Sequence, residues 1–231
     1  MLYPEIKSKE IERLSNQISK KILVQIEGPT CSGKTSFAFD LCLGLVEKGI
    51  NVMCIEEAAA KVLKENRGII EQLQSDPGSH KWNETKLELQ RKVISEQLIS
   101  LSNFAENNDY VIAIMDRGGA STAYHTIPLL SNEVEKESIQ NLCREMAKMA
   151  ELTLMISSLG FLKRDSLRYQ KTINEIGQEA IGIKNYLDGW TIRYLEIPAI
   201  TRAARLTVGL KYVLYEIMGQ NAKQASQSYK T

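Results

Sequence analysis

A run of eight residues, from Gly28 to Thr35, reads GPTCSGKT and fits the pattern GxxxxGK(S/T) without a mismatch. Because glycine has no Cβ atom, such a run can turn tightly and point successive backbone N–H groups at phosphate oxygens. Lys34 supplies a mobile cation for the β- and γ-phosphates, and the hydroxyl of Thr35 is a ligand for Mg²⁺. The pattern predicts a loop that binds ATP with magnesium, formed by Gly28, Thr30, Cys31, Ser32, Gly33, Lys34 and Thr35.

Charged residues follow the hydrophobic run 110–115. The run ends in Asp116, and in proteins with this loop a carboxylate at the end of a second strand holds the metal. An Asp that only caps the next loop is the alternative interpretation. Arg117 comes directly after it, and a cation there is suited to holding an acceptor phosphate or hydroxyl, or to stabilising the phosphoryl group during transfer.

Two further groups of polar side chains are candidates for an acceptor site. Glu57 follows Glu56 at the end of another apolar run, where a carboxylate could accept the proton of an attacking hydroxyl. A pair of glutamates favoured by a helix N-terminus is an equally good interpretation. Gln90 and Gln97 fall on one helical stripe with apolar residues, where amides either cap buried backbone groups or read the hydrogen-bonding edge of a ligand.

Basic residues gather in the segment after the apolar run 152–157. On a helix, Arg164, Arg168 and Lys171 would share one face at i, i+4 and i+7 spacing. Such a face could close over the triphosphate as a lid that supplies cations and excludes water. A solvated basic face is the alternative.

These side chains need a scaffold, and the hydrophobic period of the chain switches repeatedly between short β-rich runs and long helical runs. The alternation is typical of a parallel α/β sheet, in which ligands bind at the carboxyl ends of the strands. We expect one P-loop domain over 1–231, with a five-stranded parallel sheet flanked by helices and a basic lid segment. The predicted strands are 23–27, 52–56, 110–115, 152–157 and 192–197. The predicted helices are 36–48, 58–74, 83–106, 134–150 and 199–218, with a further helix in 1–20 and a polar tail over 219–231.

Composition narrows the class of protein. Hydrophobic residues make up 43% and charged residues 25% of the 231 residues, which is ordinary for a globular protein and excludes disorder. The net charge is only +1, so a protein that grips a nucleic-acid backbone is disfavoured. No run approaches the roughly 18 apolar residues of a membrane span, and residues 1–20 have no apolar core of a secretory signal. Four scattered cysteines fit reduced thiols, so we expect a cytoplasmic protein.

Five segments of the chain together resemble the small P-loop nucleoside and nucleotide kinases: GPTCSGKT, IEEAAAKVL, LELQRKVISEQ, MDRGGASTAYHT and FLKRDSLRYQK. The nicotinamide-riboside-kinase-like ATPases are the most similar group, because a DRG followed a few residues later by AY is typical of them. Thymidylate kinases and deoxynucleoside kinases are more distant. The resemblance spans roughly residues 22–210.

The resemblance implies a role for each matching residue. It implies metal binding by Thr35 and Asp116 and phosphate binding by Gly33, Lys34, Thr35 and Ser36. It implies acceptor-side roles for Glu57, Arg117 and Gln90, and lid roles for Arg164 and Arg168.

The chain departs from this family at two acceptor-side positions. Ala60 stands where relatives often carry an Arg three residues after the strand-end Glu, with Lys61 adjacent. Ser121 and Thr122 occupy the segment after DRG, where many relatives have an Asp. The predicted phosphate donor site does not depend on either position.

Two hypotheses for function follow. The first is an ATP-dependent kinase that transfers the γ-phosphoryl group to a nucleoside, nucleotide or similar acceptor, so that ATP and a small molecule are the expected partners. The alternative is a regulatory P-loop ATPase that switches conformation for a protein partner, which the departures at Ala60 and Ser121 favour. The absence of an NKxD tetrapeptide argues against a GTPase. Helices 83–106 and 134–150 could pair across the two-fold axis of a homodimer.

A few other residues are ambiguous. His125 lies near the predicted acceptor site, but an isolated histidine is more often structural than catalytic. Arg202, Arg205 and Lys211 either flank the adenine or form a solvated face.

Overall fold

Five parallel strands form one sheet at the centre of the molecule, in the order β2-β3-β1-β4-β5. The computed structural model describes residues 8–19, 21–69, 80–158 and 172–228. The predicted five-stranded parallel sheet is confirmed, and each strand lies within or close to its predicted range. The strands are β1 (Ile22–Glu27), β2 (Val52–Ile55), β3 (Ile112–Asp116), β4 (Leu152–Ile156) and β5 (Leu195–Ile197).

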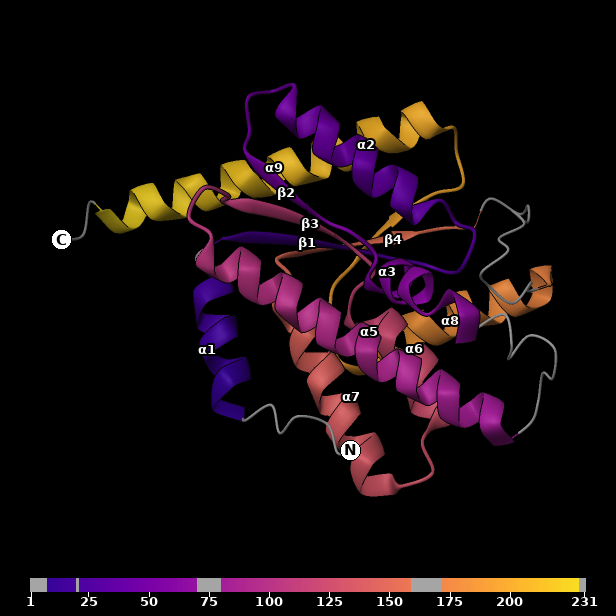
Figure 1. Ribbon diagram of the computed structural model, residues 1–231. Helices are drawn as coiled ribbons and strands as arrows, with labels where there is room; N and C mark the ends of the chain where they lie inside the picture. Colours follow the sequence, from indigo (N-terminus) through magenta and orange to yellow (C-terminus); the bar gives the residue numbers. More distant parts are fainter. Residues whose placement is uncertain (1–7, 20, 70–79, 159–171, 229–231) are drawn as a thin grey trace.

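Helices cover both faces of this sheet (Figure 1). On one face lie α2 (Lys34–Val46) and α9 (Arg202–Ser228), which pack against each other. On the other lie α1 (Ser8–Ile18), α5 (His80–Glu106) and α7 (Glu133–Lys148). Further helices are α3 (Ala58–Glu65), α6 (Gly119–Thr126), the short 3-10 helix η1 (Ile127–Leu129) and α8 (Ile173–Gly189).

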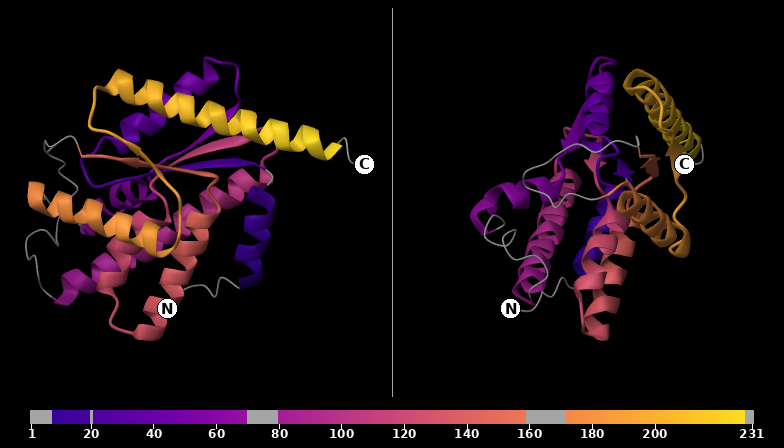
Figure 2. Two further views of the ribbon diagram at one scale, coloured as in Figure 1. Left: turned by 180° about the vertical axis from the view of Figure 1, so that it is seen from behind. Right: turned by 90° about the vertical axis from the view of Figure 1, so that its right-hand side faces the viewer.

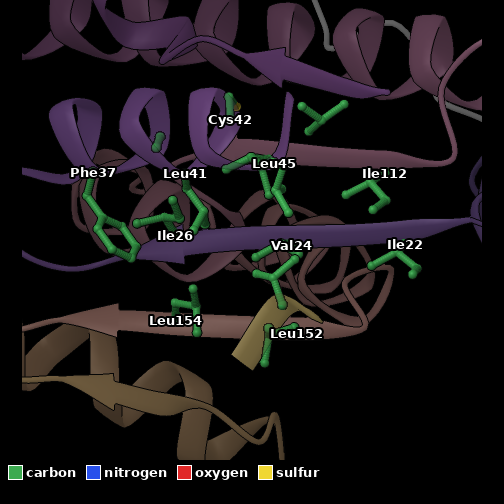
Figure 3. Close-up of a cluster of buried hydrophobic side chains, with 14 of the residues drawn as sticks. Ile22, Val24, Ile26, Phe37, Leu41, Cys42, Leu45, Ile112, Leu152 and Leu154 are labelled. Carbon is green, nitrogen blue, oxygen red and sulfur yellow. The ribbon is translucent and has the colours of Figure 1, made fainter. Parts of the chain in front are cut away.

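The side chains of β1 alternate between the two layers because successive residues of a strand point to opposite faces. Ile22, Val24 and Ile26 pack under α2 and α9, as Figure 3 shows, whereas Leu23 packs against α1 and α5. The same alternation directs Gln25 and Glu27 to the face of Leu23. β1, β3 and β4 are buried along their whole length, as expected for parallel strands covered on both sides.

Three predicted boundaries were wrong for identifiable reasons. Within the helix predicted over 58–74, α3 ends at Glu65, because the Asn66 side chain donates a 2.8 Å hydrogen bond back to the Val62 carbonyl and competes with the helix. Residues 67–69 are helical again, and 70–74 lie outside the described residues. The strand predicted over 192–197 begins only at Leu195, because the Ile192 amide closes the end of α8 by donating to Leu187. The helix predicted over 199–218 begins at Arg202 and continues to Ser228, through most of the predicted tail.

Helix α9 is long and lies along the outer side of the sheet, and its C-terminal part projects beyond the sheet (Figure 2). None of the helices within the described ranges is long and apolar enough to span a membrane.

Candidate active site

The phosphate loop connects the end of β1 to the start of α2, as its sequence predicted. Gly28 has φ 145°, and a Cβ atom there would lie 2.6 Å from the Ile156 carbonyl oxygen of the adjacent strand. Gly33 has φ 84° and precedes the first turn of α2. The backbone conformation therefore requires glycine at both positions. This conformation places the N-terminus of α2 at the loop, where the positive end of the helix dipole can interact with an anion.

Lys34 lies inside the loop that it would use to bind phosphate. Its Nζ donates a 2.7 Å hydrogen bond to the Pro29 carbonyl oxygen. Burial and the nearby Arg117 charge lower the pKa of Lys34, while the carboxylates of Asp116 and Glu57 act in the opposite direction. The ammonium group thus lies among charges of both signs. It would have to give up its hydrogen bond to Pro29 to bind a phosphate oxygen.

Asp116 ends β3, the strand that pairs with β1, and lies opposite Ile26 in the register. Its side chain is buried, yet neither carboxylate oxygen receives a hydrogen bond of good geometry from the described residues. Burial and the Glu57 charge raise the pKa of Asp116, and the Thr35 hydroxyl and Lys34 oppose that rise. A buried carboxylate that receives no well-aligned hydrogen bond, beside a threonine hydroxyl, fits a cation bound between the two.

Magnesium is the cation that suits such a pair. Mg²⁺ is usually bound through one or two protein oxygens, with waters and substrate phosphates completing its coordination. The described residues contain no cluster of three or more His, Cys, Asp or Glu side chains that would hold a metal by themselves. The residue set of Thr35 and Asp116 therefore fits a nucleotide-bound magnesium better than a metal held by protein alone.

Arg117 and Glu57 form a buried ion pair, with 3.0 Å between the guanidinium Nη1 and the carboxylate Oε1. The side chains are 11% and 5% exposed, so the pair is far less screened than a surface ion pair. The Arg117 backbone has φ 78° and is fixed on both sides: its amide donates to Ile26 and its carbonyl accepts from Gln97. The structure thus brings together two predicted acceptor-side residues, from the segments that follow β2 and β3.

The two glutamines of α5 differ in role. Gln97 is buried, donates to the Arg117 carbonyl at 3.0 Å, and accepts from the Thr122 hydroxyl at 2.9 Å. It therefore caps buried groups and supports Arg117. Gln90 is half-buried and accepts a long 3.5 Å hydrogen bond from the Thr126 hydroxyl, so its predicted acceptor role stays a prediction.

The other predicted residues fall in several places. Ser36 is exposed in the first turn of α2. Lys61 does not replace the missing Arg at position 60, because its Nζ pairs with Glu96 of α5 at 2.6 Å. Arg202 pairs with Asp40 on the surface through two 2.6 Å hydrogen bonds. Arg164, Arg168 and Lys171 lie outside the described residues.

Two buried charged residues contact the phosphate loop: Arg205, whose role the sequence did not indicate, and Glu179, which the sequence analysis did not single out. Arg205 of α9 donates to the carbonyls of Ser32, Ser157 and Pro198, so it is a clamp on three segments and not part of a solvated face. Glu179 of α8 accepts from the Thr30 hydroxyl at 3.1 Å and contacts His125 Nε2 at 2.9 Å. The only signal for Glu179 in the sequence was a carboxylate amid apolar residues.

The loop and Asp116 lie at the carboxyl ends of adjacent strands, which defines a P-loop nucleotide-binding protein. A family model for AAA domains matches residues 23–205, and the chain belongs to that family. A search of curated proteins found no match.

Two solved structures have a similar fold. A NadR protein, determined in complex with NR, has a TM-score of 0.52 and 16% sequence identity, over 78% of this chain and 44% of that one. The chain therefore spans less than half the length of that NadR protein. The thymidylate kinase from Ehrlichia chaffeensis has a TM-score of 0.52 and 18% identity, over 84% of this chain and 98% of that one. The predicted P-loop kinase-like fold is confirmed.

Proposed function

We propose that the protein is an ATP-dependent phosphotransferase that moves the γ-phosphoryl group to a nucleoside, nucleotide or similar small acceptor. The observation that carries this proposal is the buried Arg117–Glu57 pair beside Asp116, in line with the phosphate loop. Across the sheet, Glu57 follows β2, Asp116 ends β3 and the loop follows β1, so the three stand in the order of adjacent strands. ATP hydrolysis needs only the phosphate loop and Asp116. The buried Glu57 carboxylate and Arg117 guanidinium beside them are suited to binding a second substrate, the acceptor.

The donor half of the reaction is positioning and charge neutralisation. The amides of the loop and of the first turn of α2, including those of Gly33 and Ser36, would bind the phosphates, and Lys34 would exchange its Pro29 contact for a phosphate oxygen. Thr35 and Asp116 would hold magnesium, which neutralises charge on the phosphates when bound. Arg164 and Arg168 would supply further cations from the lid.

On the acceptor side, Glu57 would receive the proton of an attacking hydroxyl as the new oxygen–phosphorus bond forms and the bond to ADP breaks. Arg117 orients that carboxylate and offers its remaining N–H groups to the incoming oxygen or to an acceptor phosphate. If the acceptor is already a phosphate, no base is needed and Arg117 provides the main contact. The names of the two similar structures, a NadR protein with NR and a thymidylate kinase, support acceptors of this size.

The decisive experiment measures ADP formation with a panel of nucleosides and monophosphates, chosen first by the thermal shift that each gives with a non-hydrolysable ATP analogue. A kinase forms ADP in proportion to one class of acceptor, and the phosphorylated acceptor appears in equal amount. Lys34→Ala should abolish turnover. Slow ATP hydrolysis that no acceptor changes would contradict the proposal.

That contrary outcome would favour a regulatory ATPase whose switch is read by a protein partner. One observation supports this alternative: Lys61 is paired with Glu96, so Lys61 does not take the place of the Arg that relatives often carry at position 60. The acceptor panel separates the two functions directly.

A further inference from the structure

Glu27, the last residue of β1, is a buried carboxylate that the proposed transfer chemistry does not use. It directly precedes Gly28 of the phosphate loop, and its side chain has no exposed area. Because β1 alternates, Glu27 points away from α2 toward the layer that contains α6. A fully buried carboxylate is costly unless its charge is compensated, so its partners indicate what it does.

Those partners are the first residues of α6. Oε1 of Glu27 accepts from the Ala120 amide at 3.0 Å, and Oε2 accepts from the Ser121 amide at 3.2 Å and also from the Ser121 hydroxyl. A helix begins with backbone N–H groups that lack a partner in the helix, and a side chain usually caps them. Gly118, the residue before α6, has no side chain for this purpose. Glu27, at the end of β1, therefore caps the N-terminus of α6.

Gly118 is required by this close approach. A Cβ atom at Gly118 would lie 2.1 Å from Oε1 of Gln25 and 2.7 Å from Oε1 of Glu27. Both of those side chains project from β1, so the backbone after Arg117 runs directly over the strand that carries the phosphate loop. The Ser121 hydroxyl donates to Glu27, whereas a carboxylate at position 121 would repel it.

We propose that Glu27 is a positioning residue that fixes Asp116 and Arg117 relative to the phosphate loop; its kinetic consequences rest on the proposed function. Only Arg117 and Gly118 separate the end of β3 from the start of α6. This short link is fixed at one end by the pairing of β3 with β1, and at the other by Glu27 holding the first turn of α6. Glu27 thus ties the metal and acceptor residues to the strand that carries the donor loop.

Burial of the charged Glu27 carboxylate lowers the stability of the folded state. Desolvation raises the pKa of Glu27, and the Ser121 hydrogen bonds and the charges of Arg117 and Lys34 only partly oppose that rise. A residue kept for stability alone would lose stability when neutralised. A residue kept for positioning would lose activity while the folded state lost little or gained.

The test compares Glu27→Gln with Glu151→Gln, an exposed glutamate just before β4 that serves as the matched control. In Glu27→Gln one of the two accepting oxygens becomes an NH₂ group that cannot accept from a backbone N–H, so the first turn of α6 loses part of its cap. We expect Tm to be equal to or above that of the control, and kcat to fall by about 100-fold, since a misplacement of about 1 Å can have that effect.

Calorimetry keeps this inference separate from the proposed function. Glu27→Gln should bind ATP without magnesium within about threefold of the wild type but lose most of the increase in affinity that magnesium gives, because Asp116 is misplaced. Ser121→Ala should lose a smaller part of the increase in ATP affinity that magnesium gives. If no acceptor is turned over by the wild type, the proposed function fails while this measurement still decides the role of Glu27. Wild-type magnesium dependence in both variants, or a lower Tm with unchanged kcat, would overturn the inference.

Discussion

Arg117 adopts a left-handed backbone conformation, with φ 78°, that costs a residue with a side chain about 1–2 kcal/mol. Such a conformation persists only where surrounding contacts hold it, and here the Ile26 carbonyl, Gln97 and the Glu57 carboxylate do so. From this backbone position the guanidinium donates to Glu57 at 3.0 Å. An arginine held this way should act on the acceptor more than on ATP.

Arg117→Ala should therefore lower kcat/KM for the acceptor by about 100-fold, the usual effect of removing one donor to developing charge, while KM for ATP changes by less than about threefold. Arg117→Lys keeps the charge but loses the planar guanidinium, so its kcat/KM for the acceptor should lie between those of the wild type and Arg117→Ala. Steady-state kinetics with each substrate varied in turn checks the result. Arg202→Ala, a surface arginine paired with Asp40, is the control. Equal losses for both substrates would argue against an acceptor role.

Cys31 offers a direct chemical probe of the loop. It lies within GPTCSGKT and is half-exposed, whereas Cys143 is buried and burial raises the pKa of its thiol to about 12. Nucleotide bound in the loop should cover Cys31 and slow its alkylation by iodoacetamide at least about tenfold, with Cys143 unreactive throughout. Peptide mass spectrometry locates the label. In Lys34→Ala, ATP should give little protection of Cys31. No protection of Cys31 in the wild type would mean that the nucleotide binds elsewhere, and full protection in Lys34→Ala would mean that Lys34 is not needed for binding.

At the scale of elements, α9 supports the phosphate loop through Arg205. One guanidinium donates to carbonyl groups from three segments: the loop itself, the residue after β4 and the residue after β5. Burial lowers the pKa of Arg205, but an arginine still remains charged. Helix α9 therefore holds the loop in place as well as covering the sheet.

Arg205→Met should lower the free energy of unfolding by about 2–4 kcal/mol, because the buried Ser32 carbonyl loses a charged donor worth about 1.5–3 kcal/mol and water replaces the donors to the part-buried Ser157 and Pro198 carbonyls only in part. Nucleotide affinity should fall as well, since the Ser32 carbonyl is no longer fixed. Urea unfolding and calorimetric titration of ADP are the measurements. Arg205→Lys, with fewer donors, should recover part of the stability. If Arg205→Met binds ADP as the wild type does, the clamp serves stability alone.

Elements with a strong local pattern could be predicted from sequence, and those that depend on neighbours could not. The phosphate loop and Asp116 carry their signals within a few residues, and α2, α5 and α7 have clear apolar faces. Helix α6 was missed because Gly118 and Gly119 begin it, and its cap comes from Glu27 on another strand. The roles of Arg205 and Glu179 likewise depend on segments far apart in the chain. The acceptor and lid roles remain predictions.

At the scale of the whole molecule, the strand order β2-β3-β1-β4-β5 sets Glu57 two strands away from the phosphate loop, with Asp116 between them. Two substrates bound at these neighbouring sites would be in contact, so neither has to dissociate before the other binds. Initial rates should then give intersecting lines in double-reciprocal plots, the signature of a ternary complex. Parallel lines would instead indicate a phosphorylated enzyme and a ping-pong cycle. For the proposed phosphotransferase, the strand order therefore predicts direct transfer between two substrates bound at the same time.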